Sequence, residues 1–215
     1  MTVCKLFADR FLYAPWMLHL DVFRPALDVQ LGSRSRPDLV GQRQNGDWLA
    51  LECKGCLSPP NSKVKHRAKQ QAMRVVSIGG VAPALHIGGV AYFKKDVLRF
   101  YWRDPEPDPA IPNPIRVQPT SDTWRFYYDP VFQLIRSRPA YLEQMREEPV
   151  LMPVDEADIK VGIKPPVLRQ LVEGHWEQAR EVARKGPQGG DIYHGDGIAV
   201  KAGPSWSTRQ PEPEG

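Results

Sequence analysis

Two carboxylates and one ammonium group stand at the ends of two short apolar segments. Asp38 follows Pro37, and Glu52 and Lys54 close the apolar run that begins at Trp48. Such charges are costly at the end of a buried strand unless a cation or hydrogen bonds compensate them. A divalent metal ion compensates carboxylates, holds phosphate oxygens and activates a water molecule. These three residues therefore indicate a metal-dependent hydrolytic site for a phosphate-containing substrate.

The segments that carry these residues are expected to form a β-hairpin around Asn45-Gly46, a dipeptide typical of tight turns. Side chains alternate between the two faces of a strand. Glu52 and Lys54 therefore point to one face, while Cys53 points to the other.

The length of the hairpin loop decides whether Asp38 reaches the same face. In an antiparallel hairpin, the two residue numbers of every opposed pair add to the same sum, which the loop length sets. Asp38 lies opposite Glu52 only if this sum is even. A two-residue turn gives an odd sum. A three-residue loop, with Gly46 in the left-handed conformation, pairs Arg43 with Asp47 and gives the even sum. The site therefore requires an odd-length loop or a bulge.

A helix is predicted directly after the second strand. Asn61 or Ser62 caps it, and it continues to about Val76. A mostly cationic face lies beside its apolar stripe, and this face is either a nucleic-acid contact or an ordinary solvated surface. The candidate nucleic-acid-binding residues on the helix are Lys63, Arg67, Lys69 and Arg74.

The other elements divide the chain into four parts. Residues 1–103 are expected to form the core, with a helix over 5–20 that is kinked or interrupted at Pro15, and with a second hairpin formed by residues 84–93 and 97–102. Six prolines between 104 and 119 predict a stiff loop or linker. A mainly helical extension is predicted over 120–209, including one helix over 165–185, and a disordered tail over 210–215. The expected fold class is α/β.

The charge is unevenly distributed along the chain. The net charge of the whole protein is +4, but residues 1–103 hold 16 Lys or Arg against 7 Asp or Glu, a balance of +9. The remaining residues carry a balance of −5. A basic half that also contains the carboxylates suits a site that handles a polyanion.

No apolar run approaches the ~20 residues of a membrane-spanning helix, so no membrane association is expected. The charged and proline-containing N-terminus does not have the pattern of a signal peptide. The three cysteines are too few for a disulfide scaffold and suit a reducing compartment, so a cytoplasmic location is expected.

Pro37-Asp38 followed by Glu52-Cys53-Lys54 resembles the motif of the PD-(D/E)XK, or restriction-endonuclease-like, nuclease superfamily. The resemblance covers residues 1–103 and implies a mixed central sheet flanked by helices. It also implies a catalytic set of Asp38, Glu52 and Lys54. Many members carry a Gln or Lys on the following helix, which Gln70 or Lys69 matches here, and Asp9 is a possible match to an acidic residue of the first helix.

The resemblance further implies Mg²⁺ as the cofactor, with Mn²⁺ as a substitute. Asp38, Glu52 and the backbone carbonyl of Cys53 would bind the metal, and Lys54 would orient the attacking water or stabilise the charge that grows on the phosphate. The implied activity is hydrolysis of DNA, with RNA a less favoured substrate and a role in defence or restriction as one possibility. A homodimer or a partner protein is compatible with this activity.

Two other hypotheses remain open from the sequence. One is a nucleic-acid-binding or assembly subunit that keeps the nuclease-like fold without cleavage. The other is a redox or zinc protein that uses the Cys-x-x-Cys formed by Cys53 and Cys56. A second acidic-x-Lys triplet, Asp158-Ile159-Lys160, has no apolar strand before it and is interpreted as a polar loop.

Overall fold

The computed structural model describes residues 2–30, 36–104, 113–186 and 192–206. The chain divides into two compact units, Met1–Tyr127 and Tyr128–Gly215. The boundary differs from the linker predicted over 104–119, because strand β8 (Ile115–Pro119) pairs with two other strands of the first unit. The tail predicted over 210–215 lies outside the described residues. None of the described helices is long and apolar enough to cross a membrane.

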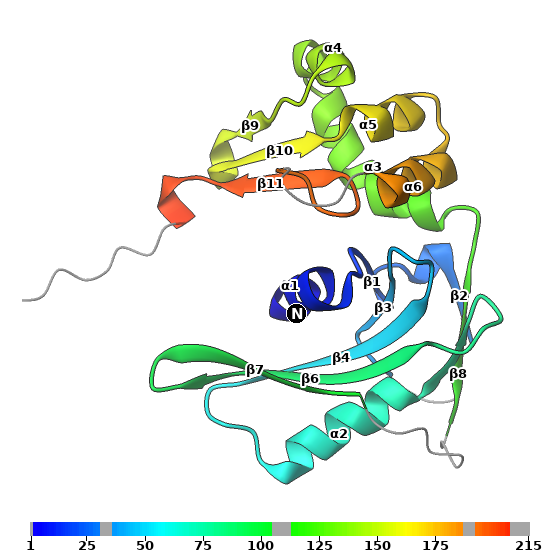
Figure 1. Ribbon diagram of the computed structural model, residues 1–215, viewed down its shortest axis with the longest axis vertical. Helices are drawn as coiled ribbons and strands as arrows, with labels where there is room; N and C mark the ends of the chain where they lie inside the picture. The colour runs from blue at the N-terminus through cyan, green and yellow to red at the C-terminus, as the bar shows by residue number, and fades with distance from the viewer. Residues whose placement is uncertain (1, 31–35, 105–112, 187–191, 207–215) are drawn as a thin grey trace, which may run out of the picture. The chain divides into compact units, whose positions relative to one another are not determined.

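A mixed five-stranded sheet forms the centre of the first unit, in the order β1-β3-β4-β6-β7. Strands β4 and β6 run parallel, and the other neighbours are antiparallel. Helices α1 (Thr2–Leu12) and α2 (Ser62–Met73) cover opposite faces of this sheet (Figure 1). The predicted α/β class, with a mixed central sheet flanked by helices, is confirmed. The five strands are β1 (Trp16–His19), β3 (Leu39–Gln42), β4 (Trp48–Cys56), β6 (Leu85–Lys94) and β7 (Val97–Arg103).

Alternate residues of β4 belong to two different cores. Leu49 and Leu51 pack with buried residues of α1. Ala50 packs with a second, three-stranded sheet, in the order β2-β8-β5, which was not predicted. Glu52 follows Ala50 at a spacing of two, so its side chain faces the side of the sheet that α2 and the second sheet cover. The strands that flank β8 are β2 (Leu27–Gln30) and β5 (Val75–Ile78).

The first helix is shorter than predicted. It ends at Leu12, and Tyr13 has a positive φ of 53°. Pro15 lacks the N–H that would continue the helical hydrogen bonds. The apolar residues from Trp16 onwards therefore form strand β1 rather than a second half of the helix, and the prediction of helix as far as Leu20 was wrong.

The hairpin between β3 and β4 has the predicted three-residue loop. Arg43 N donates to Asp47 O at 2.8 Å, and Gly46, with a φ of 96°, occupies the position that favours glycine. The Asn45 side-chain oxygen accepts from Asp47 N at 3.1 Å, which fixes the turn from within. The predicted second hairpin, between β6 and β7, is also confirmed.

The second unit contains four helices and a three-stranded sheet in the order β11-β10-β9 among its described residues, so the expectation of a mainly helical extension holds only in part. The helix predicted over 165–185 is divided at Gly174, whose φ of 77° does not belong to a helix. Short 3₁₀ turns occur at Arg24–Ala26, Asp155–Ala157 and Pro204–Trp206. The helices are α3 (Thr123–Arg136), which begins in the first unit, α4 (Pro139–Glu147), α5 (Pro165–Val172) and α6 (Trp176–Lys185). The strands are β9 (Met152–Val154), β10 (Ile159–Ile163) and β11 (Ile198–Ala202).

Candidate functional site

The register of β3 and β4 places Asp38 opposite Glu52. Leu39 pairs with Leu51, so the next pair along the strands is Asp38 with Glu52. Hydrogen-bonded and non-hydrogen-bonded pairs alternate in an antiparallel ladder, and Arg43 and Asp47 form a hydrogen-bonded pair. Counting from that pair, Asp38 and Glu52 fall in the non-hydrogen-bonded class, in which Cα atoms are only ~4.5 Å apart and side chains are closest.

Backbone hydrogen bonds hold Asp38 at this position. Its carbonyl accepts from Leu20 N at 2.9 Å, and its Oδ2 accepts from Cys53 N at 3.0 Å. The N–H and C=O of one strand residue point to the same edge, so the Cys53 carbonyl faces the edge of β4 at which Asp38 lies. It also lies beyond the last ladder pair between β3 and β4, which ends at Leu39. Two carboxylates and one carbonyl oxygen thus gather at this edge.

Glu52 is the most buried member of the group, with 1% of its surface exposed. Its Oε1 accepts a hydrogen bond from Lys54 Nζ. Its Oε2 is buried, and none of the described residues donates a hydrogen bond to it. Burial raises the pKa of Glu52, the bond from Lys54 lowers it, and the Asp38 charge raises it, with a net pKa of about 7. A buried carboxylate oxygen without a donor is unfavourable in the absence of a cation.

A glycine allows α2 to lie directly on the sheet beside Glu52. Gly88 of β6 pairs with Glu52 of β4, and a Cβ on Gly88 would lie 2.8 Å from the backbone nitrogen of Lys69. The helix backbone therefore rests on the strand next to the carboxylate, which excludes water from that side of Glu52.

The Gly88→Ala variant is expected to lose about 1–3 kcal/mol of the free energy of unfolding, because the backbone of α2 must move to admit a methyl group. Urea unfolding measures this loss. Gly55→Ala is the matched control, since no atom lies within 4 Å of its Cβ position on the same sheet. Equal stability of the two variants would show that α2 does not pack against Gly88.

The structure corrects the helix residue that was expected at the site. Gln70 is exposed and lies ~200° around the helix from Ala68, which is buried against the sheet. Its neighbour Gln71 is half-buried instead, and its side-chain nitrogen lies 3.5 Å from the Arg36 carbonyl, two residues before Asp38. Gln71, rather than Gln70, is the glutamine that lies against the segment preceding Asp38.

The predicted cationic residues of α2 lie on two sides of the helix. Lys65 Nζ lies 4.7 Å from the centre of the Tyr101 ring on β7, so this flank of the helix faces β7. Lys69 is one helical turn further along the same flank. Lys63, Arg67 and Arg74 are on the opposite flank, which is the side of Gln71. Asp9 is on α1, which packs on the other face of the sheet from Glu52.

The Cys-x-x-Cys motif does not form a cysteine pair. Cys53 and Cys56 are three positions apart on the single strand β4, so their side chains point to opposite faces. Cys53 contacts Cys4 of α1, and this contact together with burial raises the pKa of the Cys53 thiol. The geometry of the strand gives no support to a redox or zinc site built on Cys53 and Cys56.

Among the described residues, no cluster of three or more His, Cys, Asp or Glu side chains could hold a metal ion. The group at the end of β4 has two carboxylates and one backbone carbonyl, which is below that number. Mg²⁺ commonly binds through one or two carboxylates and keeps several waters. The oxygen donors and the buried Oε2 of Glu52 therefore fit such an ion without a third acidic side chain.

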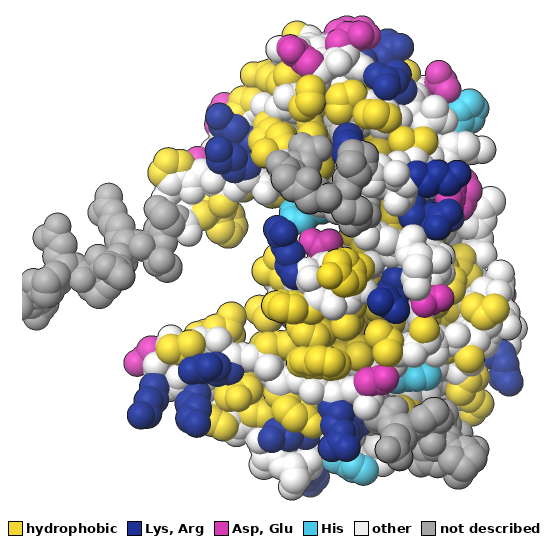
Figure 2. All heavy atoms as spheres, in the orientation of Figure 1, with side chains coloured by type: hydrophobic (Ala, Val, Ile, Leu, Met, Phe, Trp, Pro, Cys, Tyr) yellow, Lys and Arg dark blue, Asp and Glu magenta, His cyan; other side chains and the backbone are white. Residues whose placement is uncertain are grey.

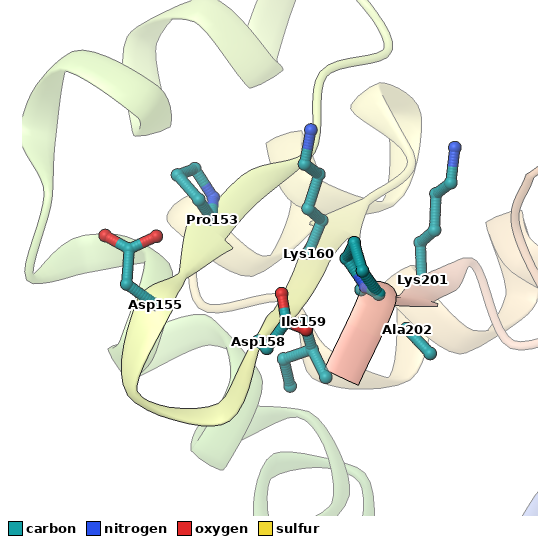
Figure 3. A pocket seen from close by; sticks show the side chains of 9 residues that line it. Pro153, Asp155, Asp158, Ile159, Lys160, Lys201 and Ala202 are labelled. Carbon is teal, nitrogen blue, oxygen red and sulfur yellow. The ribbon is translucent and has the colours of Figure 1, made fainter. Parts of the chain in front are cut away.

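The second acidic-x-Lys triplet has a different environment. It borders a pocket of about 240 Å³ in the second unit. Strand β10 begins at Ile159, so the interpretation of the triplet as a loop was wrong for Ile159 and Lys160. Asp158 accepts hydrogen bonds from Ser205 N, at 2.7 Å, and from its hydroxyl, and these bonds lower the pKa of Asp158. Lys160 and Lys201 extend in one direction, away from the Asp158 carboxylate (Figure 3). This triplet does not reproduce the arrangement of Asp38, Glu52 and Lys54.

Comparison of the chain with protein-family models, with curated proteins and with solved structures found no match.

Proposed function

We propose that this protein is a metal-dependent nuclease that hydrolyses phosphodiester bonds of DNA. The observation that carries the proposal is the meeting of Asp38 and Glu52 at the edge of β4, with Lys54 bonded to one oxygen of Glu52 and no described donor at the other. This arrangement requires three features together: the acidic-x-Lys triplet, the upstream Pro-Asp, and the odd-length loop between them.

Three groups of this chain would hold the metal ion: a carboxylate oxygen of Asp38, Oε2 of Glu52 and the Cys53 carbonyl. A bound Mg²⁺ or Mn²⁺ supplies a water of lowered pKa and a positive charge for the phosphate oxygens. The Cys53 N–H orients the Asp38 carboxylate. Ionisation of Glu52 gives a carboxylate whose Oε2 is a negatively charged oxygen ligand beside Asp38.

Lys54 has two tasks in the proposed reaction. Its ammonium group stabilises the ionised form of Glu52 through Oε1. It also lies next to the carboxylates on the same face of β4, so it can stabilise the charge that grows on a phosphate during attack by water. The basic half of the sequence, which contains these residues, attracts a polyanionic substrate.

The second candidate is a nucleic-acid-binding subunit that keeps this fold but does not cleave. The two-carboxylate set favours it, because a third acidic side chain is absent from the described residues around the site. Such a subunit would bind nucleic acid with a steep dependence on salt and without metal-dependent turnover.

The test is cleavage of plasmid and of circular single-stranded DNA in Mg²⁺ or Mn²⁺, compared with EDTA. We expect cleavage by the wild type, loss of cleavage in Asp38→Asn, and normal cleavage in the matched control Asp28→Asn, an exposed aspartate of β2. Cleavage in EDTA, or equal cleavage by Asp38→Asn, would reject the proposed site. Salt-sensitive binding without cleavage would favour the second candidate.

A further inference from the structure

The face of the sheet that carries Glu52 and Lys54 continues beyond them along β6 and β7. Lys54 pairs with Val90, and Cys56 pairs with Tyr92. Tyr92 in turn pairs with Arg99 of β7. Since paired residues share a face, Tyr92 and Arg99 lie on the same face as the carboxylates.

We name the residues Tyr92, Lys94 and Arg99 the hairpin strip. Lys94 and Arg99 are exposed, and Tyr92 is partly exposed. Lys94 is two positions beyond Tyr92 on β6, so it shares the face of Tyr92. No carboxylate of the described residues forms an ion pair with Lys94 or Arg99. Lys and Arg side chains gather over this hairpin and over α2 in the space-filling view (Figure 2).

The opposite face of the same hairpin has a different composition. Phe93, Leu98 and Trp102 occupy it, with 46%, 48% and 48% of their surfaces exposed. The two cations and the tyrosine are therefore confined to the face that carries Glu52 and Lys54.

We infer that the hairpin strip binds a single-stranded segment of nucleic acid, at the exposed end of the sheet face that carries Glu52 and Lys54. The inference rests on the proposed function, because it extends the proposed substrate site. Gly88 and Val90 are buried, so the exposed part of this face of β6 extends from Tyr92 to Lys94, ~7 Å at 3.3 Å per residue. That length holds about two nucleotides at the ~3.4 Å spacing of a stacked strand.

The chemistry of the strip selects a single strand over a duplex. Lys94 and Arg99 match the charge of the phosphates, which both forms of nucleic acid present. Tyr92 is the cross-strand partner of Arg99 and lies two positions from Lys94, and its ring offers a surface for stacking, which requires an unpaired base. The strip therefore combines cations that bind the phosphates of any nucleic acid with a tyrosine ring that stacks only on the unpaired bases of a single strand.

The test measures equilibrium binding in EDTA, so that cleavage does not contribute. The probes are a fluorescein-labelled oligothymidylate of about 20 nucleotides, longer than the strip, and a duplex of equal length. Variants are the double substitution Lys94→Glu with Arg99→Glu, and Tyr92→Ala beside its matched control Tyr92→Phe. Arg10→Glu, on α1 across the sheet, measures the effect of reversing one charge away from the strip.

We expect the double variant to bind the single strand at least about tenfold more weakly, and its salt slope to fall by about 1.4, the value for two phosphate contacts on a single strand. Tyr92→Ala is expected to lose at least about fivefold for the single strand and little for the duplex, whereas Tyr92→Phe keeps wild-type affinity. Arg10→Glu should retain most of the binding.

Three results would overturn the inference: no binding by the wild type, wild-type binding by the double variant, or equal losses for both probes in Tyr92→Ala. Failure of the proposed nuclease function is distinguishable from these results. In that case the wild type and Asp38→Asn still bind the single strand through the strip, but neither cleaves DNA in Mg²⁺.

Discussion

Lys54→Ala is expected to lower the rate of Mg²⁺-dependent DNA cleavage by roughly a hundred- to a thousandfold. The variant lacks the ammonium group that stabilises charge on the phosphate, a contribution of the same size as that of other single donors in enzyme active sites. It also leaves Oε1 of Glu52 without its bond to Lys54, which raises the pKa of Glu52 and lowers the fraction that is ionised. Single-turnover cleavage of a plasmid measures the effect.

Lys160→Ala is the matched control for this experiment. Lys160 occupies the same place in an acidic-x-Lys triplet, but Asp158 is bonded to Ser205 there. Its variant should cleave at the wild-type rate. Lys54→Met, which keeps the aliphatic part of the side chain, distinguishes loss of charge from loss of packing. Wild-type rates in both Lys54 variants would contradict the role assigned to Lys54.

Glu52→Gln is expected to increase the stability of the metal-free protein at alkaline pH while it removes stabilisation by Mg²⁺. The pKa of Glu52 is about 7 in the folded protein, against 4.5 for an ordinary glutamate. The folded state therefore holds this proton more tightly than the unfolded state does. The resulting stability is fully present below about pH 4.5 and is lost as the pH rises through 7. The loss is on the order of 3 kcal/mol.

Glutamine at this position does not ionise, so the difference between variant and wild type should grow with pH. The measured quantity is the free energy of unfolding of Glu52→Gln minus that of the wild type, both in EDTA. We expect this difference to be about 2–3 kcal/mol larger at about pH 8 than at about pH 5. Adding Mg²⁺ at one hundred times its Kd should stabilise only the wild type, by about 2.7 kcal/mol.

Urea unfolding at the two pH values, with and without Mg²⁺, checks both parts of this prediction. The matched control is Glu156→Gln, an exposed glutamate of the second unit. It should behave like the wild type in every condition. If Glu52→Gln showed the same pH dependence as the wild type, Glu52 would not be the group whose ionisation is suppressed. If Mg²⁺ stabilised both equally, the ion would bind elsewhere.

The local geometry of the residues proposed as the site was predictable from the sequence because short-range rules govern it. Alternation on β4 fixes the faces of Glu52 and Cys53, and the left-handed conformation of Gly46 fixes the register that sets Asp38 opposite Glu52. The Asn61 cap of α2 is of the same kind, since its Oδ1 accepts from Val64 N at 3.0 Å.

The missed features depend on contacts between distant parts of the chain. Strands β5 and β8 are four and five residues long, and each becomes stable only through a partner remote in sequence. The rotation of α2 about its axis, which turns Gln71 rather than Gln70 towards the segment before Asp38, is set by its contact with Gly88 on a later strand. The spacing of the Lys and Arg residues along the helix gives no information about that contact.

The three-residue loop between β3 and β4 also restricts how this hairpin can change in evolution. Removal or insertion of one loop residue shifts the pairing by one and turns Asp38 to the α1 side of the sheet. The apolar residues of β3 would then exchange cores as well. Changes of two residues preserve both the site and the packing. Insertions or deletions of an even number of residues are therefore tolerated in this loop. A change by an odd number is tolerated only where a bulge restores the pairing.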